Sequence, residues 1–200
     1  PKLIKEISKK HEIASHGYDH YDNYKNMDDD EVYKKLNETN KVLEKIIGEK
    51  IFGFRAPVFQ RPNYDILRKL GFLYDSSVNP TFIPGNYNYF FNSRKIKNHN
   101  GLYVVPLSVS PIVRLPLFWV AFRVLGLIYA KIMTMLNFID LKFVHLVFHS
   151  WEFVDLENDK NLPFLYRKNS GKKLESMLVN YIKWLKAKNV NFITIKEYLK

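Results

Sequence analysis

Apolar residues along the chain recur either at helical spacing or in short continuous runs. The clearest helical pattern covers residues 28–47, where the acidic stretch "DDDE" opens the segment and apolar residues follow every three or four positions. Acidic residues favour the first turn of a helix, and Gly48 supplies a stop. Three further segments have helical patterns: an amphipathic helix from Pro1 that ends near Lys10, a helix from Pro62 to Leu70, and a helix over 170–188 with Ser170 as its N-cap.

Short apolar runs between these helical segments predict strands. Helices that alternate with strands are typical of an α/β fold. The chain contains no internal repeat that would point to another architecture. The predicted strands are "HEIAS" (11–15), "IFGFRAP" (51–57), "FLYDSS" (72–77), "GLYVVPLS" (101–108), "KFVHLVFH" (142–149) and "VNFITI" (190–195).

Four of the predicted strands end at a residue that can carry charge. These residues are His16, Arg55, Asp75 and His149. In a parallel βα barrel or an open α/β sheet, functional groups gather at the carboxyl ends of the strands, because the loops converge there. The four residues are therefore candidates for one site.

Residues 111–139 are more apolar than the rest of the chain. A membrane span needs about 20 apolar residues with few charges, but Arg123 and Lys131 lie inside the segment, and Pro116 and Gly126 interrupt it. The pattern favours one or two helices that cover the core or line a groove. A helix that lies on a membrane surface and a true span are the alternatives.

The composition narrows the partners and the chemistry. The formal net charge is +11, but the lysines of 31–50 alternate with glutamates, as on a solvated helix face, so we do not expect nucleic acid as a partner. The chain has no cysteine, so a metal ion would need His, Asp or Glu ligands. Its 13 Tyr, 15 Phe and 3 Trp can fill a core or line a groove for sugars.

His16 and His20 are separated by three residues in "HGYDH", directly after a predicted strand. Two imidazoles at this spacing can converge on one metal ion. Such a pair is also found among ordinary core or surface histidines, and its position after a strand favours the ligand interpretation. Asp19 and Asp22 could supplement a metal site, but we expect them to be turn residues.

Four short motifs occur in a recognisable order: "SHGYDH", "RAPVF", "YDSS" and "HSWE". As a set they resemble the polysaccharide deacetylases, carbohydrate esterases of the chitooligosaccharide-deacetylase homology type. The resemblance implies a distorted parallel (β/α) barrel and the hydrolytic removal of acetyl groups from N-acetylated glycans. It also implies one divalent metal ion, with Zn2+ the first choice, held by one Asp and two His that match His16 and His20.

The resemblance assigns further roles to single residues. Arg55 would orient the catalytic aspartate, and the backbone N–H of Val58 would stabilise the oxyanion. His149 would act as general acid, with Asp75 as its buttress. Trp151, in the same motif as His149, is expected to contact the substrate.

The chain departs from the family in two ways. Gly17 follows the first ligand where Ser or Thr is usual, although a closer branch shares the glycine. The motif that supplies the catalytic base and the third ligand, a strand that ends in two aspartates, does not occur before His16. We therefore expect residues 1–200 to be a deacetylase domain whose first strands lie upstream of Pro1, with a hydrophobic helical insertion at about 111–139. Such a fragment should bind metal weakly and should not catalyse the deacetylation of a substrate.

Two alternatives to a deacetylase stay open. One is a related metal amidohydrolase that acts on a small C–N substrate. The other is a non-catalytic domain that binds carbohydrate or associates with a membrane. Residues 111–139 suggest peripheral membrane contact, and a cytoplasmic or membrane-peripheral location is favoured.

Overall fold

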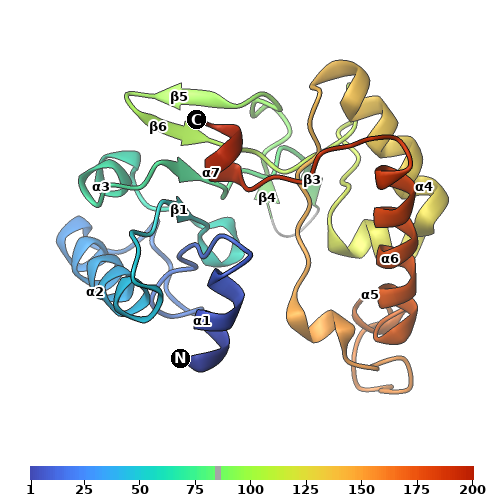
Figure 1. Cartoon of the computed structure of the whole chain (residues 1–200), viewed down its shortest axis with the longest axis horizontal. Helices are drawn as coiled ribbons and strands as arrows, with labels where there is room; N and C mark the ends of the chain where they lie inside the picture. The colour runs from blue at the N-terminus through green and yellow to red at the C-terminus, as the bar shows by residue number, and fades with distance from the viewer. Residues whose placement is uncertain (84–86) are drawn as a thin grey trace. The chain divides into compact units, whose positions relative to one another are not determined.

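The structure, a computed structural model, describes residues 1–83 and 87–200 (Figure 1). The chain forms two compact units, and each is described by itself. Unit 1 comprises Pro1–Val78, Lys95–Pro106 and Ile193–Lys200, and unit 2 comprises Asn79–Arg94 and Leu107–Phe192.

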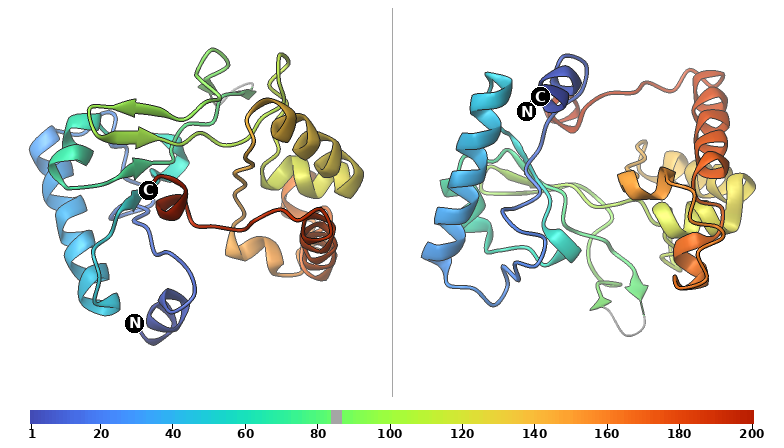
Figure 2. Two further views of the ribbon diagram at one scale, coloured as in Figure 1. Left: turned by 45° about the horizontal axis from the view of Figure 1, so that its top comes forward. Right: turned by 90° about the horizontal axis from the view of Figure 1, so that it is seen from below.

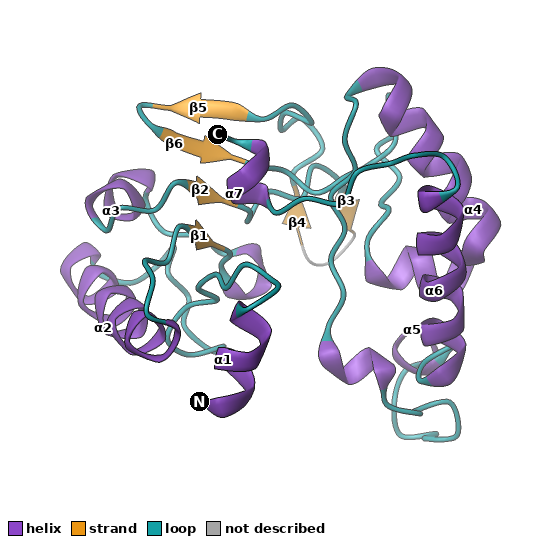
Figure 3. Cartoon of the chain, in the orientation of Figure 1, coloured by secondary structure: helices purple, strands orange, loops and turns teal. Residues whose placement is uncertain are grey.

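Unit 1 is built on a small open sheet with strand order β1-β2-β6-β5 (Figure 3). Its strands are β1 (Gly53–Phe54), β2 (Tyr74–Asp75), β5 (Lys97–His99) and β6 (Leu102–Val104). β1, β2 and β6 run parallel, with Phe54 opposite Asp75 and Asp75 opposite Val104, whereas β5 is antiparallel to β6. The parallel order brings the ends of β1 and β2 to the same edge of the sheet.

Helices and a buried apolar cluster complete unit 1. The helices are α1 (Lys2–Ser8), α2 (Asp29–Ile47), the 3-10 turn η1 (Pro57–Phe59), α3 (Tyr64–Lys69) and α7 (Ile195–Tyr198). α2 contributes Val32 and Leu36 to a core that also contains Phe54 and Leu67. The Asp28 carboxylate caps the start of α2, and Gly48 ends the helix in the left-handed conformation at φ 80°, so the predicted helix over 28–47 is confirmed.

Unit 2 is mainly helical. It contains the hairpin β3 (Phe82–Ile83) and β4 (Tyr87–Asn88), the helices α4 (Trp119–Asp140), α5 (Phe164–Arg167) and α6 (Lys172–Lys186), and the 3-10 turn η2 (Ser150–Phe153). α4 and α6 lie side by side, as both views in Figure 2 show. Between them the ring of Phe122 meets the rings of Phe148 and Tyr181 edge-on, with centroids 5.1 and 5.2 Å apart.

α4 confirms the prediction of helix in 111–139 and shows where the helix is interrupted. Gly126 has φ 85° and ψ −178°, which divides α4 at this residue. Phe122, Ala130 and Met133 lie in the core of unit 2. Among the described residues, α4 is the one helix with the length and apolar composition of a membrane span, a criterion that uses length and composition only.

Several predicted strands and one predicted cap differ in the structure. Within 11–15 only Ser15 pairs, through a single parallel bridge to Phe54. Residues 142–149 do not form a strand. The N–H groups of Ser108 and Trp119 donate to the carbonyls of His145 and Val147 at 3.0 and 3.1 Å, but in the described part of the chain no strand runs beside this segment. The predicted strand over 190–195 is also absent, because Thr194 is the N-cap of the short helix α7. The N-cap of α6 is Gly171 and not Ser170. The sheet is not closed, so the structure confirms a mixed α/β fold and not a full barrel.

Candidate active site

His16 stands at the end of a segment that runs beside β1. The N–H of Ser15 donates to the Gly53 carbonyl, and the N–H of Arg55 donates to the Ser15 carbonyl, both at 2.9 Å. His16 Nδ1 then lies 2.8 Å from the Arg55 carbonyl oxygen. Because a carbonyl can only accept, Nδ1 carries the proton, and in the neutral ring Nε2 is then the nitrogen with the lone pair. Histidines that bind metals are commonly oriented in this way.

The rings of His16 and His20 are neighbours. Their centroids are 5.7 Å apart, the ring planes are inclined by 66°, and both residues are exposed. This separation is compatible with both rings contacting one ion. Across residues 1–83 and 87–200 there is no cluster of three or more His, Asp or Glu side chains suited to a metal. The two histidines fit a metal site as a pair of donors.

Gly17 is required by the turn between the two histidines. Its φ is 88°, and a Cβ at this position would collide with the hydroxyl of Tyr24. That hydroxyl accepts the N–H of Tyr18 at 2.7 Å and so fixes the turn. Burial raises the pKa of Tyr24 to about 12, which keeps the hydroxyl neutral. The glycine in place of Ser or Thr is therefore a consequence of how this loop is packed.

Asp19 and Asp22 have structural partners, as expected for turn residues. Asp19 accepts the N–H of Tyr21 at 2.9 Å, and Asp22 forms an ion pair with Lys35 on α2 at 2.6 Å. Their carboxylates stabilise the loop that carries His16 and His20.

Arg55 follows β1 and reaches the end of β2. Its Nε donates to the Ser76 carbonyl at 3.0 Å, and the guanidinium also contacts the Ser76 hydroxyl. Burial lowers the pKa of Arg55 to about 10. The side chain thus links the ends of two neighbouring strands, while its role toward a catalytic aspartate stays a prediction.

Asp75 organises the loop that follows Arg55. The carboxylate is fully buried, and Oδ1 accepts the N–H of Ser77 at 3.0 Å as well as the Ser77 hydroxyl. The Ser77 oxygen accepts the N–H of Ala56 at 2.8 Å. Burial raises the pKa of Asp75 to about 6. Within the described residues Oδ2 has no hydrogen-bond partner.

The turn after Ala56 has an unusual backbone. Val58 and Phe59 have φ of 50° and 59°, a region that is sparsely populated by residues other than glycine. Local strain of this kind concentrates at functional sites. The Val58 side chain is exposed, and the role of its N–H as an oxyanion donor stays a prediction.

His149 belongs to unit 2, unlike the residues above, so the predicted buttressing of His149 by Asp75 stays a prediction. His149 precedes η2 and is surrounded by aromatic rings. The ring of Trp151 is stacked on it at 5.6 Å with an interplanar angle of 22°, and Trp119 meets it edge-on at 5.2 Å. Tyr166 contacts both tryptophans, at 5.8 and 6.0 Å. These rings offer broad apolar faces next to a titratable group.

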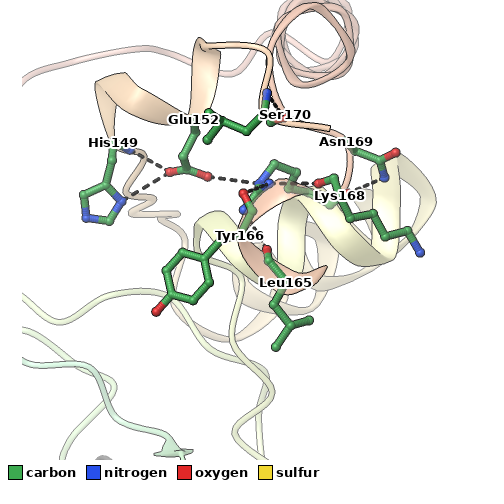
Figure 4. Close-up of polar contacts among 9 residues, drawn as sticks. His149, Glu152, Leu165, Tyr166, Lys168, Asn169 and Ser170 are labelled. Atoms are coloured by element: carbon green, nitrogen blue, oxygen red, sulfur yellow. Dashed lines mark hydrogen bonds and ion pairs between the residues drawn. The ribbon is translucent and has the colours of Figure 1, made fainter. Parts of the chain in front are cut away.

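Two charged residues behind His149 were not recognised from the sequence. Glu152 accepts the His149 N–H at 2.7 Å (Figure 4), and its other oxygen lies 3.3 Å from Nε of Arg123. A Glu three residues after a turn-starting residue is a capping-box signal that could have identified Glu152. Arg123 was noted only as an obstacle to a membrane span.

Comparisons with known proteins show which proteins this chain resembles. Residues 1–74 match the model of the family described as polysaccharide deacetylase. Two structures assigned to that family, from Mycobacterium smegmatis and Pseudomonas aeruginosa, share 28% and 22% identity over 62% and 55% of this chain, with TM-scores of 0.43 and 0.40. The matched regions span 38% and 35% of those chains. A search of curated proteins found no match.

Two other solved structures match nearly the whole chain. The PuuE allantoinase has 17% identity and a TM-score of 0.62, and the match covers 100% of this chain and 61% of that one. The Bc1960 peptidoglycan N-acetylglucosamine deacetylase, in complex with a naphthalenyl N-hydroxybenzamide, has 17% identity and a TM-score of 0.55, and the match covers 98% of this chain and 67% of that one. At this identity the likeness establishes the fold alone. The resemblance of this chain to the polysaccharide deacetylases is confirmed, and residues 1–74 carry the match to that family.

Proposed function

We propose that this chain is part of a metal-dependent deacetylase that removes acetyl groups from the N-acetylated sugars of a glycan. The observation that carries the proposal is the orientation of His16, whose Nδ1 is bound to the Arg55 carbonyl beside the His20 ring. Both histidines lie in the part of the chain that matches the deacetylase family.

His16 and His20 would hold the metal ion, with Zn2+ the first choice. When bound, a divalent ion lowers the pKa of a water nucleophile and polarises the substrate carbonyl. The third ligand and the catalytic base are expected from an aspartate motif that residues 1–200 do not contain. Arg55 is proposed to orient that base.

The remaining residues would act on the acetamide. The N–H of Val58 would stabilise negative charge on the carbonyl oxygen, because a fixed donor is most effective where charge develops. Trp151 would contact the sugar. As the C–N bond breaks, the bonding electrons go to nitrogen, and His149 would donate the proton that nitrogen needs. Water supplies the hydroxyl group of acetate, and the other product is the amino sugar.

Metal binding by the 200-residue chain tests the first part of the proposal. Isothermal titration with Zn2+ should show one weak site that is lost in the His16→Ala, His20→Ala double variant. His11→Ala removes another exposed histidine of unit 1 and serves as the control. Unchanged binding in the double variant would contradict the proposed site.

Acetate release tests the second part. The complete gene product with Zn2+ should release acetate from N-acetylglucosamine oligomers or peptidoglycan, and His149→Ala should lower kcat by about 100-fold or more. Residues 1–200 alone should release none. Acetate release by this 200-residue chain would show that an aspartate motif outside residues 1–200 is not needed.

The fold also supports a second candidate function. The structure of an allantoinase matches the entire chain at a TM-score of 0.62, so an amidohydrolase that acts on a small C–N substrate is the main alternative. Activity on allantoin without acetate release from acetylated sugars would favour it. Oligosaccharide binding with neither activity would favour a non-catalytic binding domain.

Peripheral membrane contact through residues 111–139 is a further part of the proposal. The exposed side of α4 carries Ile128, Ile132 and Ile139, which are 77%, 52% and 69% exposed, while polar Thr134 faces the core. An anionic bilayer suits an apolar face on a chain of net charge +11. The chain should sediment with anionic vesicles, and Ile128→Glu with Ile132→Glu should abolish this. Equal sedimentation of both proteins would contradict the proposed contact.

A further inference from the structure

Glu152 makes two contacts to His149 through the same oxygen. Oε1 accepts the backbone N–H of His149 at 2.7 Å and lies 3.2 Å from Nδ1 of its ring (Figure 4). An ionised carboxylate can only accept hydrogen bonds, so the ring contact requires a proton on Nδ1. When the ring is protonated on both nitrogens, as a general acid must be, the proton that it can donate is then the one on Nε2.

Arg123 is the charge that accompanies Glu152 in the interior. Both side chains have no exposed surface, and Nε of Arg123 lies 3.3 Å from Oε2 of Glu152. A buried carboxylate is costly without a cation beside it, and removal of one partner leaves an uncompensated charge. Arg123 is therefore the cation that offsets the cost of burying the Glu152 carboxylate next to His149.

The position of Arg123 is determined by backbone groups on a different segment. Nη1 donates to the carbonyls of Tyr166 and Lys168, and Nη2 donates to that of Leu165, each at 2.8 Å. These carbonyls lie at the end of α5, where helical carbonyls lack partners within the helix. In return, Asn169 Nδ2 donates to the Arg123 carbonyl at 2.9 Å. The guanidinium cannot move without breaking this set of bonds.

The aromatic rings around His149 restrict the remaining freedom of its side chain. Trp151 covers one face of the imidazole, and Trp119 meets it edge-on. Trp119 is the first residue of α4, the helix that also supplies Arg123. One helix thus contributes both the ring that packs on His149 and the cation behind its carboxylate partner.

We propose that Glu152 is a positioning residue that holds His149 with the proton on Nδ1 and presents Nε2 to substrate, and that Arg123 on α4 is the buried counter-ion that holds Glu152 in place. This inference rests on the proposed function for the use of Nε2 as the acid. It gives the apolar segment 111–139 a role in the site that does not depend on a membrane.

The tautomer of His149 tests the proposal directly on the 200-residue chain. Long-range 1H–15N spectra at about pH 9, where ordinary imidazoles are neutral, should show His149 with its proton on Nδ1. His149→Gln assigns the signal. In Glu152→Ala the proton should move to Nε2, because the acceptor beside Nδ1 is gone. Glu175→Gln, which changes an exposed carboxylate of α6, should leave the signal unchanged.

A proton on Nε2 in the wild-type chain would overturn the proposal, as would an unchanged spectrum in folded Glu152→Ala. If Glu152→Ala does not fold, the His149 tautomer is compared between the wild type and Glu152→Gln instead. The Gln side chain retains an oxygen acceptor and should keep the proton on Nδ1. A proton on Nε2 in both the wild type and folded Glu152→Gln would refute the positioning role.

Kinetics of the complete gene product separate this inference from the proposed function. Glu152→Ala should lower kcat by about 10-fold or more with little change in KM, and Glu152→Gln should recover part of it. Full kcat in Glu152→Ala would contradict the positioning role. A wild-type protein that releases no acetate would refute the deacetylase proposal, while the tautomer experiment, which needs neither metal nor substrate, would still decide the role of Glu152.

Discussion

Two of the candidate site histidines, His16 and His149, are held by different kinds of group. In unit 1, His16 is oriented by a backbone carbonyl, that of Arg55, next to the sheet. In unit 2, His149 is oriented by the side chain of Glu152, which in turn depends on Arg123. A backbone acceptor survives most substitutions, whereas a chain of buried side chains can fail at any member. Unit 2 should therefore be the more sensitive to single substitutions.

The largest effect is expected when the buried ion pair of unit 2 is broken. Arg123→Ala leaves Glu152 buried without a cation and should destabilise unit 2 by about 3–5 kcal/mol. All three tryptophans, Trp119, Trp151 and Trp184, belong to unit 2, so tryptophan fluorescence during urea denaturation follows this unit.

Two further variants sharpen this test. Lys172→Ala removes an exposed cation from α6 and should change the stability by less than about 0.5 kcal/mol. Replacement of both partners by Met should recover much of the lost stability, because no charge is left buried. A cost for Arg123→Ala as small as that of Lys172→Ala would show that the pair is not what holds unit 2 together.

The second effect is a pH dependence in unit 1 that arises from Asp75. Its pKa is raised by burial from 3.8 to about 6, so the folded state binds the proton more tightly than the unfolded state does. This contribution is fully present below about pH 4 and is lost as the pH rises through about 6, with a total of about 3 kcal/mol. Hydrogen exchange of α2 amides reports on unit 1.

Asp75→Asn should flatten this profile, since an amide has no charge to bury and its oxygen can still accept from Ser77. Asp30→Asn, at an exposed position in the first turn of α2, should leave the profile as it is in the wild type. A profile that stays the same in Asp75→Asn would assign the pH dependence to other groups.

The third effect concerns the turn that carries the two metal-candidate histidines. Gly17→Ala forces a Cβ into the Tyr24 hydroxyl at a positive φ and should cost about 1–3 kcal/mol and weaken Zn2+ binding. Gly71→Ala has a similar φ of 79° with no atom near the added Cβ, so it should cost about 1 kcal/mol. The difference measures the collision with Tyr24, and equal losses in the two variants would show that only the backbone angle matters.

Local signals along the chain predicted a good part of this protein. α2 was predicted because its caps and its apolar periodicity are properties of neighbouring residues. The predicted strands over 142–149 and 190–195 were wrong, because an apolar run indicates burial but does not say whether another strand is available to pair with it. The contact between Arg55 and Ser76 was not predicted; the two residues meet because β1 and β2 are parallel neighbours.

The sequence by itself determined which functional side chains are present: two histidines spaced for one ion, a third in "HSWE", and motifs whose order matches the polysaccharide deacetylases. Only the tertiary structure decided what holds each group in place. Glu152 could be suspected from its spacing to His149, but its charge partner comes from a helix far away along the chain. In the sequence, Arg123 is a charge that interrupts an apolar segment, whereas in the structure it is the ion-pair partner of Glu152. The stability of a buried charge depends on its three-dimensional neighbours and not on its neighbours in the chain.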